Sequence, residues 1–321
     1  MAWLDADRLL LNDDAQLWRL SYPSGEVSRI TNDLIAYRHL SLTADRQTLV
    51  TTRSERRAKV WVGTANGATG TDVVEPSIEV GVNVAWAAGR LLFERRDAIW
   101  SIVPGKEAAR ELIANATAPA ASADGRTILY RPADRGDGGG TWKADGDGRP
   151  ISRVLTEPEQ FVVSRDGRFG VYLSTHSGLQ SPWVIALDTG AASRLDDDFV
   201  PGAAYDVSPD GTSVLFHRPR PGGEGEIVIC ALPACSAPRT IEAPRRALGR
   251  IRFTPDGRGV AFKDPTNVNL MVQPFDGRAA YPLTRFTSGD LLDFAWSADG
   301  ARLAIVRATT TNDIVLFRGL R

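Results

Sequence analysis

The chain has 321 residues, of which 43% are hydrophobic and 24% are charged. Lysine and arginine number 38 and the acidic residues 39, so the formal net charge is −1. This balance does not favour binding to nucleic acid. No apolar stretch reaches the roughly 18 residues that a membrane-spanning helix needs, so we expect a soluble chain with no membrane insertion. The 30 glycines and 19 prolines indicate many turns and disfavour long helices.

A short turn of the type Ser/Thr-x-Asp-Gly recurs along the chain, each time between two alternating apolar runs. In such a turn Asp is well accommodated at the second turn position, and Gly adopts the positive φ that closes a tight hairpin. The aspartates of these turns are therefore interpreted as structural. The near-copies are Ser122-Ala123-Asp124-Gly125, Ser164-Arg165-Asp166-Gly167, Ser208-Pro209-Asp210-Gly211, Thr254-Pro255-Asp256-Gly257 and Ser297-Ala298-Asp299-Gly300. Worn versions, in which part of the pattern is lost, are Asp5-Ala6-Asp7, Thr43-Ala44-Asp45-Arg46 and Ala87-Ala88-Gly89.

A third strand with a tryptophan, or an aliphatic residue in its place, is predicted after each hairpin. The marker residues are Trp18, Trp61, Trp100, Trp142, Trp183, Ile227, Leu270 and Ile314. Their separations of 43, 39, 42, 41, 44, 43 and 44 positions give a period of about 42 residues. A glycine turn and a short edge strand follow, as at residues 147–155 and 188–195.

Each repeat therefore predicts a four-stranded antiparallel sheet, which buries its faces only by packing radially against neighbouring sheets. The fold class is all-β, a β-propeller of eight repeats, with seven blades as the alternative count. We expect a single domain over residues 1–321. The repeats span roughly 1–34, 35–77, 78–115, 116–156, 157–198, 199–244, 245–288 and 289–321.

The last repeat is incomplete, because it is predicted to stop after its third strand. The N-terminus reads as an innermost strand, so no spare strand is evident to close the ring. Two explanations remain open: a three-stranded last blade, or a chain cut from a longer parent. Residues 132–140 and 219–225 are glycine-rich and are interpreted as loops between second and third strands.

The hairpins and tryptophan strands resemble the TolB-type, WD-like propeller repeats of bacteria over essentially the whole chain. Residues 16–26 (QLWRLSYPSGE), 29–34, 37–38, 285–287, 293–297 and 312–316 also resemble the C-terminal propellers of bacterial serine/threonine protein kinases and winged-helix regulators. That resemblance implies an interaction or sensing module of a longer signalling protein. It does not imply kinase activity, since the chain has no glycine-rich nucleotide loop and no His-Arg-Asp or Asp-Phe-Gly motif.

Candidate chemistry is sparse. The three histidines, His39, His176 and His217, lack the spacing of metal ligands, so neither a metal nor another cofactor is expected. A Gly-x-Ser-x-Gly elbow is also missing, so we predict no catalytic residue. Cys230 and Cys235 have four residues between them, and they either form a disulfide in an oxidising compartment or remain reduced.

The predicted function is a non-enzymatic binding, scaffold or sensing module for a protein, peptide or envelope ligand. In this fold, ligands usually dock in the central funnel. Tyr37, Arg38, His39, Tyr205 and Asp206 are the candidate ligand-binding residues, because they lie on predicted first strands. The alternative is a propeller enzyme, lyase- or glycosidase-like, with its site in that funnel. The compartment stays open between periplasm, if a membrane-anchored parent exports the propeller, and cytoplasm; the oligomeric state is also open.

Overall fold

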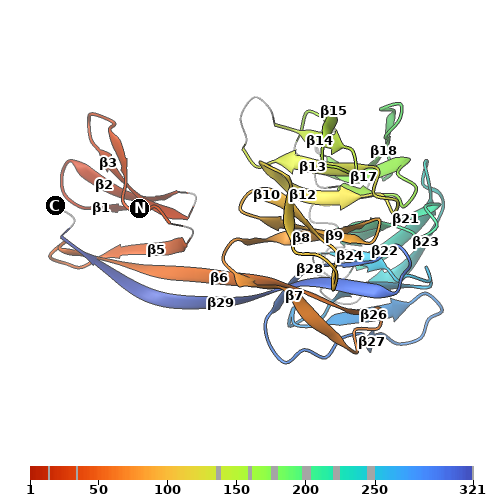
Figure 1. Cartoon of the computed structure of the whole chain (residues 1–321). Coiled ribbons are helices and arrows are strands. Elements are labelled where there is room, and N and C mark those ends of the chain that lie inside the picture. The colour runs from red at the N-terminus through yellow and green to blue at the C-terminus, as the bar shows by residue number, and fades with distance from the viewer. Residues whose placement is uncertain are drawn as a thin grey trace. The chain divides into compact units, whose positions relative to one another are not determined.

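The computed structural model describes residues 1–13, 15–33, 35–134, 139–157, 161–174, 180–196, 204–219, 225–243 and 250–319. All regular elements in these ranges are strands, so the all-β prediction is confirmed (Figure 1). The chain forms two compact units, which are described separately. Unit 1 comprises Met1–Ala58, Pro76–Glu79 and Ala308–Arg321, and unit 2 comprises Lys59–Glu75 and Val80–Arg307. The single domain over residues 1–321 stays a prediction.

Unit 2 contains five consecutive four-stranded antiparallel sheets, each built from one repeat. The first two sheets contain β8 (Val80–Ala87), β9 (Arg90–Arg95), β10 (Ala98–Ile102) and β11 (Arg110–Ile113), and then β12 (Ala116–Ala121), β13 (Ile128–Pro132), β14 (Thr141–Ala144) and β15 (Pro150–Leu155). The next two contain β16 (Phe161–Val163), β17 (Phe169–Ser174), β18 (Ser181–Ala186) and β19 (Ala192–Arg194), and then β20 (Tyr205–Val207), β21 (Ser213–Pro219), β22 (Gly225–Ala231) and β23 (Ser236–Ala243). The fifth contains β24 (Ile251–Phe253), β25 (Gly259–Lys263), β26 (Leu270–Pro274) and β27 (Tyr281–Pro282).

A further sheet of unit 2 combines strands from opposite ends of the chain. β28 (Asp290–Trp296) pairs with β29 (Arg302–Arg318), which pairs with β6 (Thr48–Thr64), and β7 (Gly70–Ser77) completes the sheet on β6. The last repeat thus supplies fewer than four strands, as predicted. The strands that complete its sheet come from the second repeat, a source that the sequence analysis did not find.

Hydrophobic cores lie between neighbouring sheets of unit 2, which is the packing of a propeller. One cluster joins sheet β16–β19 to sheet β20–β23 through Val184 and Phe216, and another joins β24–β27 to the shared sheet through Val272 and Phe294. The ring closes where β28 meets β8: the indole nitrogen of Trp86 donates to the Ala295 carbonyl at 3.0 Å. This arrangement confirms the propeller fold.

Unit 1 holds the first repeat and parts of two others. β1 (Ala2–Trp3), β2 (Arg8–Asp13), β3 (Gln16–Ser21) and β4 (Val27–Arg29) form a four-stranded sheet. β5 (Ala36–Leu42) pairs with the first part of β6, and Leu10, Leu17, Tyr37 and Leu49 form the buried core. In the described part of the chain the eight repeats thus make seven sheets, because the second and eighth repeats share one, and the sheet of the first repeat lies in unit 1.

Two predicted hairpins are instead single long strands. β6 continues through residues 53–59 and β29 continues through residues 307–313, where the repeat predicts a turn between the second and third strands. Both segments lack glycine and proline, and Thr309, Thr310 and Thr311 are β-branched residues that favour an extended backbone. By contrast, the connections between second and third strands at residues 132–140 and 219–225 are rich in glycine and proline.

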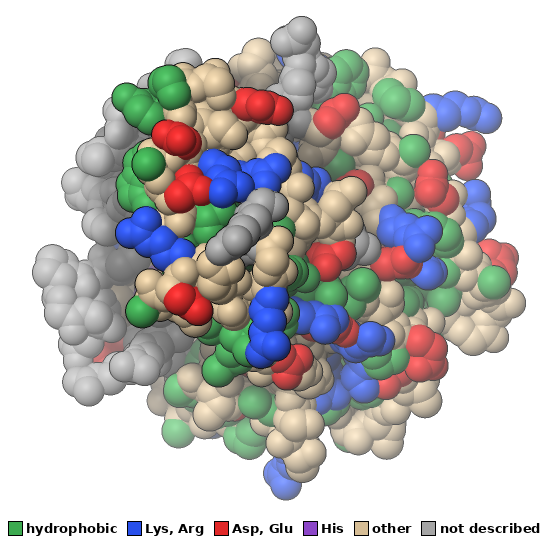
Figure 2. Space-filling view, turned by 90° about the vertical axis from the view of Figure 1, so that its left-hand side faces the viewer, with side chains coloured by type: hydrophobic (Ala, Val, Ile, Leu, Met, Phe, Trp, Pro, Cys, Tyr) green, Lys and Arg blue, Asp and Glu red, His purple; other side chains and the backbone are tan. Residues whose placement is uncertain are grey.

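The surface carries charges of both signs. Figure 2 shows one face of the molecule, on which basic and acidic side chains are interspersed with hydrophobic ones. On β6, Arg53 and Arg57 both pair with Glu55, at 2.9 and 2.7 Å, and Lys59 pairs with Asp72 of β7 at 2.6 Å. Within the described ranges, no helix is long and apolar enough to cross a bilayer.

Candidate functional site

The first strands of the six sheets of unit 2 surround an axial cavity of about 150 Å³. Its wall comes from β8, β12, β16, β20, β24 and β28 and from the turns that follow them. Most of the wall is small or apolar, as at Ala120, Val162 and Ala295. Among the described residues that line it, the charged side chains are Arg165, Arg250, Arg252 and Asp206.

The charged wall follows from strand geometry. Asp206 and Arg252 stand two positions before the Ser or Thr of the following turn, and Arg250 and Asp293 stand four positions before it. Because side chains on a strand alternate between faces, positions two and four residues before the turn share one face. In a propeller the first strand is innermost, and that face points towards the axis.

Two carboxylates bind the arginines of this wall. Asp293, which is 1% exposed, lies 3.3 Å from Nε of Arg250 and 3.5 Å from a terminal nitrogen of Arg252. Asp206 lies 3.7 Å from the other terminal nitrogen of Arg252 and accepts a hydrogen bond from the Phe253 amide at 2.8 Å. Arg252 also donates to the Phe294 carbonyl. The arginine is therefore held between the two acids, with little freedom to move.

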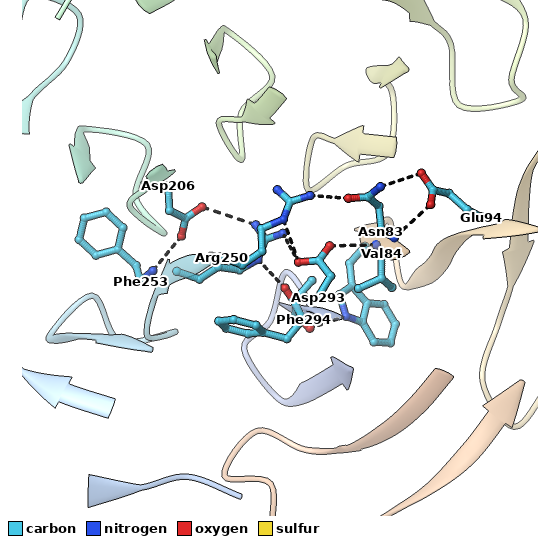
Figure 3. Close-up of polar contacts among 11 residues, drawn as sticks. Asn83, Val84, Glu94, Asp206, Arg250, Phe253, Asp293 and Phe294 are labelled. Carbon is cyan, nitrogen blue, oxygen red and sulfur yellow. Dashed lines mark hydrogen bonds and ion pairs between the residues drawn. The ribbon is translucent and has the colours of Figure 1, made fainter. Parts of the chain in front are cut away.

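The network continues into sheet β8–β11, as Figure 3 shows. Arg250 donates to the side-chain carbonyl of Asn83, whose amide donates to Glu94 at 2.7 Å. Glu94 also accepts the backbone N–H groups of Val82 at 2.8 Å and Ala118 at 2.5 Å. Asp293 in turn accepts the Val84 amide at 3.1 Å. Glu94 and Asp293 thereby hold β8 against β12 and β28, and we interpret both as positioning residues.

The protonation of Asp206 is unusual. Burial raises the pKa of Asp206 to about 6, and the nearby Arg252 and the Phe253 amide oppose that rise. The carboxyl is therefore mostly ionised at pH 7 and mostly protonated at pH 5. Three arginines and one aspartate line the cavity, and Asp293 pairs with two of those arginines from behind the wall.

No family model and no curated protein matches this chain. Solved structures do match it. A putative TolB from Agrobacterium tumefaciens has a TM-score of 0.62 at 18% identity, covering 79% of this chain and 99% of its own. TolB from Acinetobacter baumannii has a TM-score of 0.56 at 14% identity, covering 96% and 81%. The fold is that of a TolB-like propeller.

The same architecture occurs in an enzyme complex. Hydrazine synthase from Kuenenia stuttgartiensis matches with a TM-score of 0.51 at 14% identity, covering 70% of this chain and 72% of its own. At these identities the comparisons show the fold of the TolB-like propeller and leave its function to be argued from the site.

The five predicted ligand-binding residues belong to two different units. Asp206 lines the axial cavity of the TolB-like propeller, whereas the neighbouring Tyr205 packs against the core of sheets β16–β19 and β20–β23. Tyr37, Arg38 and His39 lie on β5 in unit 1. As ligand-binding residues all five stay predictions.

Local contacts show what those three side chains of unit 1 do in the fold. The Tyr37 hydroxyl donates to Asp33 at 2.9 Å, and burial followed by this hydrogen bond raises the pKa of Tyr37. The Arg38 carbonyl accepts a hydrogen bond from Thr51 at 3.0 Å. His39 is exposed at a bulge, with φ at 54°.

Arg250, Arg252, Asp293, Asn83 and Glu94 are not among the site residues predicted from the sequence. The signal for three of them was present, because Arg250, Arg252 and Asp293 occupy the same strand face as Asp206 when the repeats are aligned on their turns. Asn83 and Glu94 gave no such signal, since the third repeat has a worn turn and a bulge between Val80 and Val84.

The remaining candidates have structural positions. Cys230 and Cys235 form a disulfide with Cα atoms 4.8 Å apart, across the turn between β22 and β23. His217 is buried on β21, and burial lowers its pKa. His176 lies outside the described residues. Within the described ranges, no three His, Cys, Asp or Glu side chains are grouped to hold a metal ion.

Proposed function

We propose that this protein is a non-enzymatic binding module whose axial cavity receives an anionic group of a protein or peptide ligand. The observation that carries the proposal is the cavity wall itself, which exposes Arg165, Arg250 and Arg252 beside Asp206, while the buried Asp293 pairs with Arg250 and Arg252 from behind. The arginine side chains keep part of their surface open, 21% for Arg250 and 17% for Arg252, whereas Asp293 behind them is 2% exposed. A guanidinium that is already oriented is well suited to bind a carboxylate.

The size of the cavity supports a single group as the occupant. Pockets for drug-sized ligands have volumes of about 300–1,000 Å³, and this cavity measures about 150 Å³. A carboxylate side chain or a chain terminus fits that space, and the rest of such a ligand would lie on the face of the propeller. Rigid first strands limit the entropy that the site loses on binding.

Enzymatic use of the cavity finds less support. A lyase or glycosidase needs an acid and a base that converge on the substrate. Asp206 has the raised pKa expected of such a group, but among the described residues of the wall no histidine, glutamate, tyrosine or second aspartate accompanies it. We therefore assign Asp206 to adjusting the charge of the cavity.

The cellular setting is part of the proposal. The resemblance of residues 16–38 and 285–316 to the propellers of bacterial kinases and winged-helix regulators supports a sensing role within a longer signalling protein. The Cys230–Cys235 disulfide supports the extracytoplasmic alternative, because disulfides persist in oxidising compartments.

The test is capture from a bacterial envelope extract, followed by binding measurements with overlapping peptides of the captured protein. We expect the binding peptides to be acidic and to bind the Arg165→Glu variant at least tenfold more weakly. The matched control is Arg126→Glu, which reverses a charge on an exposed turn arginine away from the cavity wall. Equal binding by the two variants, or chemical turnover of the captured ligand, would contradict the proposal.

A further inference from the structure

A second recessed surface lies among the hairpin turns of unit 2, and we call it the turn groove. It has a volume of about 710 Å³ and is lined by the turns that follow β6, β24, β26 and β28. It continues into a second depression of about 430 Å³ over the turn that follows β20, through the shared residues Arg239, Pro255 and Asp256. The groove therefore extends across three adjacent sheets, which suits an extended ligand.

Arginines dominate the charge of the turn groove. Arg239, Arg258 and Arg278 line it together with Asp256 and Asp276. Arg278 is paired with Asp276 at 2.8 Å. One oxygen of Asp256 already accepts the Thr254 hydroxyl at 2.6 Å and the Arg258 amide at 3.0 Å. In the described part of the chain, no carboxylate lies within 4.0 Å of the guanidinium of Arg239 or of Arg258.

Three aromatic side chains, Phe275, Tyr281 and Trp296, line the turn groove. Phe275 lies under the Arg239 guanidinium, 5.1 Å from ring centre to cation, and contacts the Phe253 ring edge-on at 5.9 Å. The Trp296 indole is fixed by a hydrogen bond to the Ala65 carbonyl at 3.1 Å. Tyr281 on the edge strand β27 is 48% exposed. Arginine and large aromatic side chains are the residue types that contribute most to protein-binding energy.

We infer that the turn groove binds an extended acidic peptide segment, carrying an aromatic or proline residue, from a partner protein. The unpaired guanidiniums of Arg239 and Arg258 would receive its carboxylates, and Phe275, Tyr281 and Pro255 would contact its apolar residue. Single-stranded nucleic acid also uses arginine and aromatic side chains. A phosphate backbone carries a charge on every nucleotide and would have to pass Asp256 and Asp276, whereas a peptide can place its few acidic residues at the arginines and uncharged residues beside the two aspartates, so the charges favour a peptide.

The chain offers an internally matched control. Arg258 directly follows the glycine of a Thr-x-Asp-Gly turn, and Arg126 directly follows the glycine of the corresponding Ser-x-Asp-Gly turn in sheet β12–β15. Arg278 and Arg149 likewise each follow an Asp-Gly pair in the turn between third and fourth strands. Reversing both charges in either sheet changes the net charge of the protein equally, at equivalent turn positions.

The experiment selects a random twelve-residue peptide library on the full chain and measures the enriched peptides by fluorescence anisotropy. We expect them to be enriched in Asp and Glu beside an aromatic or proline residue. Arg258→Glu/Arg278→Glu and Arg239→Ala should weaken their binding at least tenfold and at least threefold, respectively. Arg126→Glu/Arg149→Glu and the cavity variant Arg165→Glu should leave it within twofold, which separates this site from the axial cavity.

Three results would overturn the inference. One is that no peptide dependent on Arg239 or Arg258 is recovered. Another is that both double variants lose binding equally, as a non-specific charge effect would require. The third is that a single-stranded oligonucleotide displaces the peptides and binds more tightly than they do. Thermal unfolding of each variant shows whether a loss of binding reflects a loss of folding instead.

Discussion

The surroundings of Asp206 shift the pKa of its carboxyl in opposite directions. Burial of its carboxyl raises its pKa to about 6, from 3.8 for an exposed aspartate, even though Arg252 and the Phe253 amide favour the charged form. The folded protein therefore binds this proton more tightly than the unfolded chain does. By linkage, the contribution of Asp206 to stability is greatest below pH 4 and is lost as the pH rises through 6.

The replacement Asp206→Asn tests this directly, because asparagine does not titrate. We expect the free energy of unfolding of the variant, minus that of the wild type, to increase by up to about 3 kcal/mol between pH 4 and pH 7. Urea unfolding at a series of pH values measures that difference. A difference that stays constant, or that falls with pH, would show that the pKa of Asp206 is not raised.

For single residues, the sequence predicted one position of the cavity wall, Asp206, and did not predict the arginines beside it. Asp206 was selected because it lies on a first strand, and it does line the cavity. Tyr37, Arg38 and His39 were selected by the same rule applied to the second repeat. That repeat does not form its own four-stranded sheet, because β6 runs on without a hairpin. The register rule therefore places a residue on the axial cavity of unit 2 only where the repeat completes its own sheet there, and the choice of Tyr37, Arg38 and His39 as ligand-binding residues stays a prediction.

Turns are the elements that the sequence predicted best, and their hydrogen bonds explain why. Ser208 donates to Asp210 at 2.6 Å and accepts from the Ser213 amide at 2.9 Å. The pKa of Asp210 is lowered, and the hydrogen bond donated by the Ser208 hydroxyl is the largest cause. Thr254 with Asp256 and Ser297 with Asp299 repeat the geometry. Because all the bonds lie within a few residues of chain, local sequence suffices to predict them.

We therefore expect Ser208→Ala to lower the free energy of unfolding by about 1–2 kcal/mol, since it leaves the Ser213 amide without its acceptor. Chemical denaturation measures the loss. The control Ser193→Ala, on the exposed edge strand β19, should change stability by less than about 0.5 kcal/mol. If Ser208→Ala costs no more than Ser193→Ala, the turn bonds do not stabilise the hairpin.

The shared sheet could not be predicted from local sequence. Its pairing of β29 with β6 joins residues some 250 positions apart, and no turn or spacing connects them. Burial explains why the pairing is stable: Trp61 on β6 packs with Leu270, Phe294 and Leu303, and its ring meets Phe286 edge-on at 5.4 Å. The sheet is completed by long-range packing.

Replacing Trp61 with alanine should accordingly destabilise unit 2 by about 3–5 kcal/mol, as truncating a buried aromatic does. Far-ultraviolet circular dichroism in urea is the appropriate measurement, because it does not depend on tryptophan fluorescence. Trp3→Ala is the comparison, since Trp3 is 49% exposed, and it should cost less than about 1 kcal/mol. Equal effects would mean that Trp61 contributes little to closing the ring.

For the whole molecule, the open question is whether 1–321 behaves as one domain. The repeats predict one domain, and the structure contains two compact units. β6 and β29 each contain residues that belong to both units, so neither unit can unfold without disrupting a strand of the other. Continuous strands of this kind favour cooperative unfolding.

Differential scanning calorimetry is expected to show a single transition, in which the calorimetric and van't Hoff enthalpies agree. Its total enthalpy should be about 220 kcal/mol near 60 °C, at about 0.7 kcal/mol per residue for a chain of this length. Trp61→Ala should then shift the whole transition to lower temperature. Independent units would instead give two transitions, with about 50 kcal/mol in the smaller one by the same per-residue value, and Trp61→Ala would move only the larger.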